Sequence, residues 1–261
     1  MSSFENSATP APAPLPGARR QPRAWKFWGT CLWGLLLFAA MFAGQFALVL
    51  AFFLAKGPPF DLASIKTVAS AGTVISLSVM MGLPAVLAAL WLATRMARMP
   101  LADYLALRRV SWGNLLIGVV SLIVLVVGWD LLSRMLGRDT SPGFMVDVLK
   151  SAQADGALWL LVIAFAVAAP ITEELMARGF LYRGWSESAL GPLGAIVLSS
   201  LVWTAMHAQY YDWFLFSEVM SIGLLLGYMR YRSGSTWLTI IMHGINNFAA
   251  TLQSIWLAGQ T

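Results

Sequence analysis

Two adjacent carboxylates, Glu173 and Glu174, lie inside a long apolar stretch of the chain, and Arg178 follows them. An ionisable side chain within the hydrocarbon of a membrane is costly, so it is usually paired or functional. At helical spacing Glu174 and Arg178 are i and i+4 and can neutralise each other. Glu173 lies about 100° round the helix from Glu174 and is not matched by that arginine. The spacing therefore predicts a structural role for Glu174 and a chemical role for Glu173.

The two histidines of the chain, His207 and His243, also fall in apolar stretches. Trp203 precedes His207 by one helical turn, and Asn247 follows His243 by one turn. Each pair therefore projects from one helix face, and Trp203 can wall a pocket against lipid or water. A lone buried histidine is more often a hydrogen-bonded core residue than a catalytic one. Two histidines together with an unmatched glutamate favour one shared site.

Hydrolysis is the chemistry that these residue types support. A carboxylate beside a histidine can orient and deprotonate a water molecule, and an imidazole and a carboxamide on one face can donate to a developing oxyanion. Glu173, His207 and His243 could instead bind Zn²⁺, with water as the remaining ligand, although the chain has no HExxH sequence. A polar network that only holds helices together is the third possibility. The spacing alone leaves all three open.

The composition predicts a membrane protein. Of the 261 residues, 59% are hydrophobic and 11% are charged, whereas a soluble domain has about 25% charged residues. We therefore expect an all-α, polytopic transmembrane helical bundle in contact with the lipid bilayer. Most basic residues of this chain of net charge +5 flank apolar runs, where they meet lipid head groups. This distribution argues against a nucleic-acid partner.

The apolar runs divide the chain into a tail and one domain. Residues 1–27 are rich in Pro, Ala and Ser and end in basic residues, so we expect a disordered basic cytoplasmic tail. Residues 28–261 are expected to form a single membrane-embedded helical domain. About seven spans are predicted, with an eighth short one left open, at about 31–55, 69–93, 114–135, 158–183, 192–207, 213–229 and 236–257. The bias of basic residues towards alternate loops places the N-terminus in the cytoplasm.

Small residues mark two places where helices should approach closely. Gly223 and Gly227 form a GxxxG pattern, which is most simply a close helix-packing contact. Gly244 stands beside His243 and lets another backbone or a substrate come near.

Three motifs in this order resemble the CAAX protease and bacteriocin-processing (CPBP, or Abi) family of intramembrane endopeptidases. They are Glu173-Glu174-x-x-x-Arg178, Trp203-x-x-x-His207 and His243-x-x-x-Asn247. The resemblance covers about 155–255, and the Gly223-x-x-x-Gly227 stretch looks like the family's linker between the second and third motifs. One departure is Trp203, where phenylalanine is usual, and it affects the shape of the pocket.

The resemblance implies proteolysis inside the membrane. By the family pattern Glu173 and His207 activate the water, while His243 and Asn247 stabilise the oxyanion. Glu174, Arg178 and Trp203 would support them. The family is often labelled metalloprotease, so Glu173, His207 and His243 are the ligands to consider if a divalent metal such as Zn²⁺ is used, and a metal-free mechanism stays open.

We therefore expect a multi-pass endopeptidase of the cytoplasmic (plasma) membrane that cleaves membrane-associated substrates, of the CAAX type or leader peptides, with or without a lipid attached. The alternative from another class is a catalytically idle immunity or scaffold protein that binds membrane peptides. A third hypothesis is a small transporter that uses Glu173 as a proton carrier. The sequence does not have the paired repeats that are typical of that class.

Overall fold

The computed structural model describes residues 22–138, 143–208 and 212–258, and these residues form helices and connecting turns without any strand. The predicted all-α bundle is thus confirmed. In chain order the helices are α1 (Lys26–Lys56), α2 (Leu62–Ser70), α3 (Gly72–Ala97), α4 (Leu101–Tyr104), α5 (Trp112–Met135), α6 (Gly143–Ala154), α7 (Leu158–Ile163), η1 (Ala164–Ala168), α8 (Ala169–Glu174), η2 (Leu175–Leu181), α9 (Tyr182–Ser186), α10 (Gly191–Ala205), α11 (Trp213–Ser233) and α12 (Thr236–Ala258).

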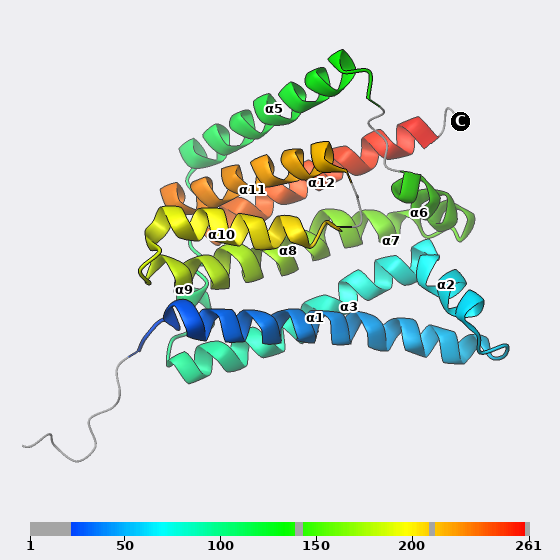
Figure 1. The fold of residues 1–261 in the computed structure, drawn as a ribbon, viewed down its shortest axis with the longest axis horizontal. Coiled ribbons are helices and arrows are strands. Elements are labelled where there is room, and N and C mark those ends of the chain that lie inside the picture. The colour runs from blue at the N-terminus through cyan, green and yellow to red at the C-terminus, as the bar shows by residue number, and fades with distance from the viewer. Residues whose placement is uncertain (1–21, 139–142, 209–211, 259–261) are drawn as a thin grey trace, which may run out of the picture.

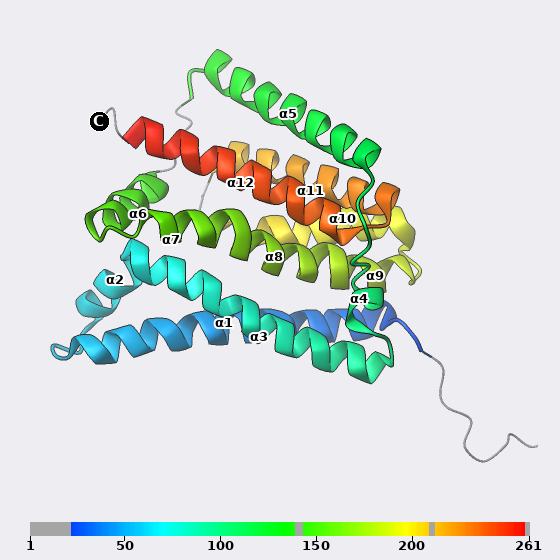
Figure 2. The same cartoon turned by 180° about the vertical axis from the view of Figure 1, so that it is seen from behind.

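The helices lie side by side as a bundle (Figures 1 and 2). The antiparallel pair α1 and α3 forms one side, α5 forms the opposite edge, and the continuous rod from α7 to α9 lies between them with α10, α11 and α12. This central rod carries the acidic motif, so both flanking groups of helices can contribute side chains to it.

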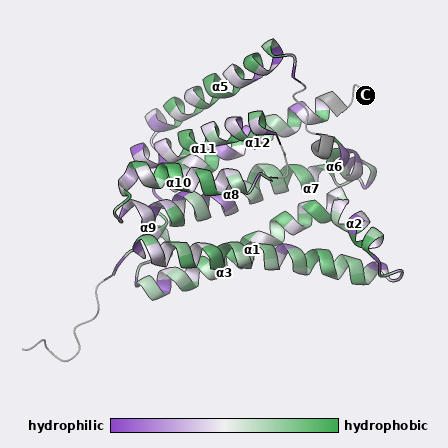
Figure 3. Ribbon diagram, viewed as in Figure 1, coloured by the Kyte–Doolittle hydropathy of each residue, from purple (hydrophilic) through white to green (hydrophobic). Residues whose placement is uncertain are grey.

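Four helical segments are long and apolar enough to cross a membrane, counting only the parts of the chain that the structure describes. They are α1, α3, α5 and the rod Leu158–Ser186, and α10 is a shorter apolar helix. Helices α11 and α12 run beside these segments (Figure 1). Each of the seven predicted spans thus corresponds to a helical segment. Figure 3 shows hydrophobic residues along most of α1, α3 and α5. The chain is an integral membrane protein.

The face that α5 turns outward is apolar. Only 11% of an 18-residue apolar stretch of this helix is buried within the protein, and Ile123, Val124 and Val127 are exposed. Large apolar side chains on the outside of a bundle are stable in lipid and unstable in water. The outer face of α5 is therefore suited to contact with acyl chains.

The central rod departs from regular α-helix on both sides of the acidic motif. Two π-helical stretches, η1 and η2, flank the α-helical turn that contains Pro170, Glu173 and Glu174. Proline has no backbone N–H to donate, and single π turns often occur where a helix accommodates such an interruption or builds a functional site. The two π turns change the directions in which the side chains before and after α8 project.

The segment before α1 is held against the end of α3. Trp25 donates through its backbone N–H to the hydroxyl of Tyr104, 3.3 Å away, and through its indole to the carbonyl of Ala93 at 3.1 Å. Burial raises the pKa of Tyr104 to about 12, so this phenol stays neutral. Residues 1–21 of the predicted disordered tail lie outside the described residues. Within the rest of that predicted tail, Lys26 already begins α1.

Gly184 in α9 lies at a close contact between the rod and α1. A Cβ atom at this position would lie 1.8 Å from the hydroxyl of Thr30, a side chain that is fully buried. We expect Gly184→Ala to lower the free energy of unfolding by about 1–3 kcal/mol, because the added methyl group overpacks this contact. Thermal unfolding of the purified protein in detergent measures the change. Gly128→Ala on α5 is the matched control, since nothing lies within 4 Å of its Cβ position. Equal effects of the two changes would contradict the close contact.

Candidate active site

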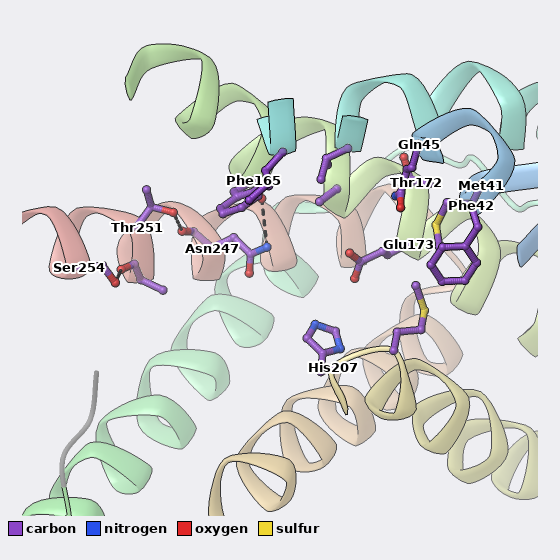
Figure 4. Close-up of a pocket in the computed structure, with 15 residues that line it drawn as sticks. Met41, Phe42, Gln45, Phe165, Thr172, Glu173, His207, Asn247, Thr251 and Ser254 are labelled. Atoms are coloured by element: carbon purple, nitrogen blue, oxygen red, sulfur yellow. Dashed lines mark hydrogen bonds between the residues drawn. The ribbon is translucent and has the colours of Figure 1, made fainter. Parts of the chain in front are cut away.

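A cavity of about 480 Å³ opens beside the acidic motif. Its walls come from α1, α3, the central rod, the end of α10 and α12, as Figure 4 shows for the labelled side chains. Glu173, His207 and Asn247 all line it and point towards the same space. Three of the four residues predicted to be catalytic, which lie on three segments far apart in the sequence, thus meet at one cavity.

Glu173 reaches the cavity from near the middle of the rod Leu158–Ser186. One of its carboxylate oxygens, Oε2, accepts a hydrogen bond of 2.7 Å from the indole N–H of Trp203. His207 lies just past the end of α10, and its Nδ1 is 3.0 Å from the carbonyl oxygen of Trp203. If that nitrogen carries the proton, it donates to the carbonyl, and Nε2 is then the basic nitrogen of the ring.

Asn247 is oriented by the central rod. Its Nδ2 donates a hydrogen bond of 3.0 Å to the carbonyl oxygen of Phe165 in η1. A carboxamide nitrogen carries two hydrogens, so one remains for a ligand in the cavity. Nearby, Gly244 lets α12 approach the rod, since a Cβ atom there would lie 2.9 Å from the carbonyl oxygen of Ala166. The predicted close backbone approach at Gly244 is confirmed, and the partner is the rod itself.

Glu174 and Arg178 form the buried ion pair that the spacing predicts. Nη1 of Arg178 donates to Oε1 of Glu174 at 2.8 Å, and both side chains have an exposed fraction of 0%. Nη2 of Arg178 donates to the carbonyl oxygen of Gly223 in α11 at 2.9 Å, and its guanidinium carbon lies 4.8 Å from the centre of the Trp203 ring. The pair is thus joined to two other helices and compensated by several partners.

His243 contacts this ion pair and is not among the residues that line the cavity. Its Nδ1 lies 3.1 Å from Oε1 of Glu174, and its side chain has an exposed fraction of 2%. An ionised carboxylate only accepts hydrogen bonds, so Nδ1 is the donor, and Nε2 of a neutral ring then carries a lone pair. The structure therefore places His243 against Glu174, apart from the three residues that face the cavity.

The residues considered as metal ligands do not assemble into a ligand set. Within 22–138, 143–208 and 212–258, no three His, Cys, Asp or Glu side chains are placed so that they could hold one ion. His243 is turned to Glu174, whereas Glu173 and His207 face the cavity. The donor set Glu173, His207 and His243 does not fit a metal ion in this arrangement.

The sequence did not predict two features of the site. The first is the hydrogen bond from Trp203 to Glu173. The sequence signal for it was the residue type alone, because tryptophan has an N–H donor that phenylalanine lacks. The second is the wall built by α1 and α3, which includes Phe42, Gln45 and Val79. These helices lie outside the stretch that resembles a known family, so no motif pointed to them.

The close helix-packing contact predicted from the GxxxG pattern is confirmed. A Cβ atom at Gly223 would lie 3.1 Å from the ring of Trp203, and one at Gly227 would lie 2.9 Å from Ile196. Both glycines thus let α11 approach α10 closely, and this approach brings the carbonyl of Gly223 within reach of Arg178.

Fold and cavity together define a multi-pass helical membrane protein with an internal site built from carboxylate, imidazole and carboxamide groups. Comparison with known proteins narrows this class. Residues 155–249 match the family described as type II CAAX prenyl endopeptidase Rce1-like. The resemblance drawn from the three motifs is thereby confirmed over this segment, and at the family level the match supports an intramembrane endopeptidase, that is, a hydrolase.

Two curated proteins are similar to parts of the chain. An uncharacterized 24.3 kDa protein of Escherichia coli is 28% identical over 149 residues, which are 56% of this chain and 65% of that protein. The UPF0177 protein YbdI of Lactococcus lactis subsp. lactis (strain IL1403) is 37% identical over 87 residues, 33% of this chain and 44% of that protein. The chain thus spans less than two thirds of the length of either relative. No solved structure matches.

The buried ion pair should dominate the stability of the site region. Arg178→Met removes the partner of a fully buried carboxylate, so we expect the free energy of unfolding to fall by about 3–5 kcal/mol. Thermal or denaturant unfolding in detergent measures it. Arg134→Met is the control, because Arg134 pairs with Asp130 at an exposed position and should cost less than about 1 kcal/mol. A loss at Arg178 no larger than at Arg134 would contradict the role given to the pair.

Proposed function

We propose that this protein is an intramembrane endopeptidase that hydrolyses peptide bonds of membrane-associated substrates, with water activated by Glu173 and His207. The observation that carries the proposal is the convergence of Glu173, His207 and Asn247 on one cavity within a membrane-embedded bundle. The match of residues 155–249 to a family of prenyl endopeptidases supports it.

Glu173 acts as the general base. Its Oε2 is held by Trp203, which leaves Oε1 to take a proton from a water molecule in the cavity. His207, which also lines the cavity, holds the same water through Nε2, because its Nδ1 lies against the carbonyl of Trp203. The hydroxide oxygen then forms a bond to the carbonyl carbon of the substrate, and the carbonyl oxygen becomes negatively charged. When the C–N bond breaks, the proton held by Glu173 passes to the leaving amine.

Asn247 supplies a donor to the oxyanion. One N–H of its carboxamide is used by Phe165, and the other can reach the negative oxygen that forms on the substrate. His243, which the family pattern also assigns to the oxyanion, can donate through Nε2 only when both of its nitrogens carry protons, since Nδ1–H is used by Glu174. In the neutral form His243 instead orients Glu174 from the α12 side.

The side chains that line the cavity indicate the class of substrate. Its walls on α1 and α3 are mostly apolar, with Met41, Phe42, Ile75 and Val79 facing it and Gln45 adding one carboxamide. Such a wall favours a peptide that is itself inserted in or attached to the membrane. CAAX-type peptides and leader peptides both meet this condition. The bias of basic residues towards alternate loops supports a cytoplasmic N-terminus. The mechanism needs no step that involves a metal.

Replacement of the proposed base gives the decisive experiment. We expect Glu173→Gln to lower kcat by about 100- to 10,000-fold, because the amide cannot accept the proton of water. The assay measures cleavage of two peptide libraries in proteoliposomes, one of CAAX peptides with and without an S-farnesyl group and one of membrane leader peptides. Glu218→Gln is the control, since Glu218 is a half-buried carboxylate on α11 that does not line the cavity.

The same assay separates the proposed function from its alternatives. Folded wild-type protein that cleaves no peptide, together with a Glu173→Gln variant that keeps the cellular role of the protein, would establish the idle scaffold. Activity that depends on an electrochemical gradient would instead indicate a transporter.

Asn247 offers a second test. Asn247→Ala removes the proposed oxyanion donor, so kcat should fall by about 100- to 1,000-fold while the protein remains folded. Single-turnover cleavage of the best library peptide measures this step. Gln253→Ala, which removes an exposed carboxamide from the same helix, should leave kcat unchanged. Retention of full activity by Asn247→Ala would exclude the donor role.

A further inference from the structure

Trp203 contacts four charged or ionisable side chains of the site region, namely Glu173, Arg178, His207 and His243. It is 3% exposed, and its indole N–H donates to Glu173 at 2.7 Å. Its ring face lies under the guanidinium of Arg178 at 4.8 Å. Its ring centre lies 4.7 Å from that of His207 and 5.3 Å from that of His243, both in edge-to-face arrangements. One side chain thus contacts all four of these groups.

The N–H of Trp203 determines how Glu173 is presented. A carboxylate on a helix can rotate about its side-chain bonds, and Glu173 could turn towards Arg178, the nearest guanidinium on the same rod. Both Glu174 and Glu173 interact electrostatically with that arginine. The hydrogen bond to Oε2 opposes this rotation and leaves Oε1 available to the cavity that Glu173 lines. A base must be held close to its productive position, because a displacement of about 1 Å can cost 100-fold in rate.

Arg178 in turn keeps the indole in place. The cation lies over the ring face, an arrangement that attracts the electron-rich centre of an indole, and Gly223 lets Trp203 pack directly on the α11 backbone. A phenylalanine ring could fill much of this volume and face the same cation, but it has no N–H. The packing role and the donor role of Trp203 can therefore be separated by experiment.

We propose that Trp203 is a positioning residue of the hydrolytic site, whose indole N–H orients the carboxylate of Glu173 towards the water while its ring face separates that carboxylate from the Glu174–Arg178 ion pair. This inference rests on the proposed function and adds a residue to it. The N–H is neither consumed nor transferred in the reaction.

The experiment removes the N–H and keeps the ring. Trp203 is replaced by 3-benzothienylalanine through amber suppression, which puts sulfur in place of N–H, and Trp203→Phe is made in parallel. We expect kcat for the best library peptide to fall about 10- to 100-fold in both, with KM changed less than about twofold. A role in packing alone would leave the benzothienyl variant at the wild-type kcat, and that result would overturn the inference.

Trp129→Phe is the matched control. Trp129 also donates its indole N–H to a side-chain oxygen at 2.7 Å, that of Ser221, and it lies on α5 away from the cavity. Its replacement should leave kcat and KM unchanged. If wild type cleaves peptides and Glu173→Gln does not, yet the benzothienyl variant equals wild type, the inference fails while the proposed function stands.

A second measurement does not depend on activity. A double-mutant cycle combines the benzothienyl substitution with Glu173→Ala and follows thermal unfolding in detergent. We expect the two changes to be coupled by at least about tenfold in the unfolding equilibrium constant, as for a hydrogen bond to a charged group. Additive effects would show that Trp203 and Glu173 do not interact, and they would overturn the inference even if the protein cleaves no peptide.

Discussion

The structure of the site depends on one buried ion pair, Glu174 with Arg178. Both side chains are completely buried in an apolar bundle, where a single charge without its partner would be unstable. The pair also fixes neighbouring helices, because Arg178 donates to the backbone of α11 and His243 of α12 contacts Glu174. The pair therefore helps to fix the rotation of the central rod relative to α11 and α12, and with it the direction of Glu173.

Two adjacent glutamates have different roles because successive residues on a helix face about 100° apart. Glu174 faces the interior and is neutralised there, whereas Glu173 faces a cavity of about 480 Å³. Trp203 lies between the two environments, with its ring on Arg178 and its N–H on Glu173. A water-accessible carboxylate and a buried ion pair can thus coexist within one helical turn.

The cavity joins two parts of the chain with different relations to known proteins. Glu173, His207 and Asn247 belong to the segment that matches the prenyl endopeptidase family, whereas Phe42, Gln45 and Val79 of α1 and α3 lie outside it. The cavity thus combines side chains of the family-like segment with a wall from a part of the chain that the family match does not cover. In the proposed function, the α1–α3 pair is accordingly the part of the cavity wall that would contact the substrate outside the family-like segment.

Most of the helices, the Glu174–Arg178 pair and the close contacts at Gly223 and Gly244 could be predicted from the sequence, because each depends on local periodicity or on residue size. The tertiary structure alone decided that Trp203 donates to Glu173, that His243 turns to Glu174 and that α1 and α3 close the cavity. Helical periodicity determines which residues share a face of one helix. It does not determine which face of a neighbouring helix they meet, because that rotation is set by the packing of all the helices together.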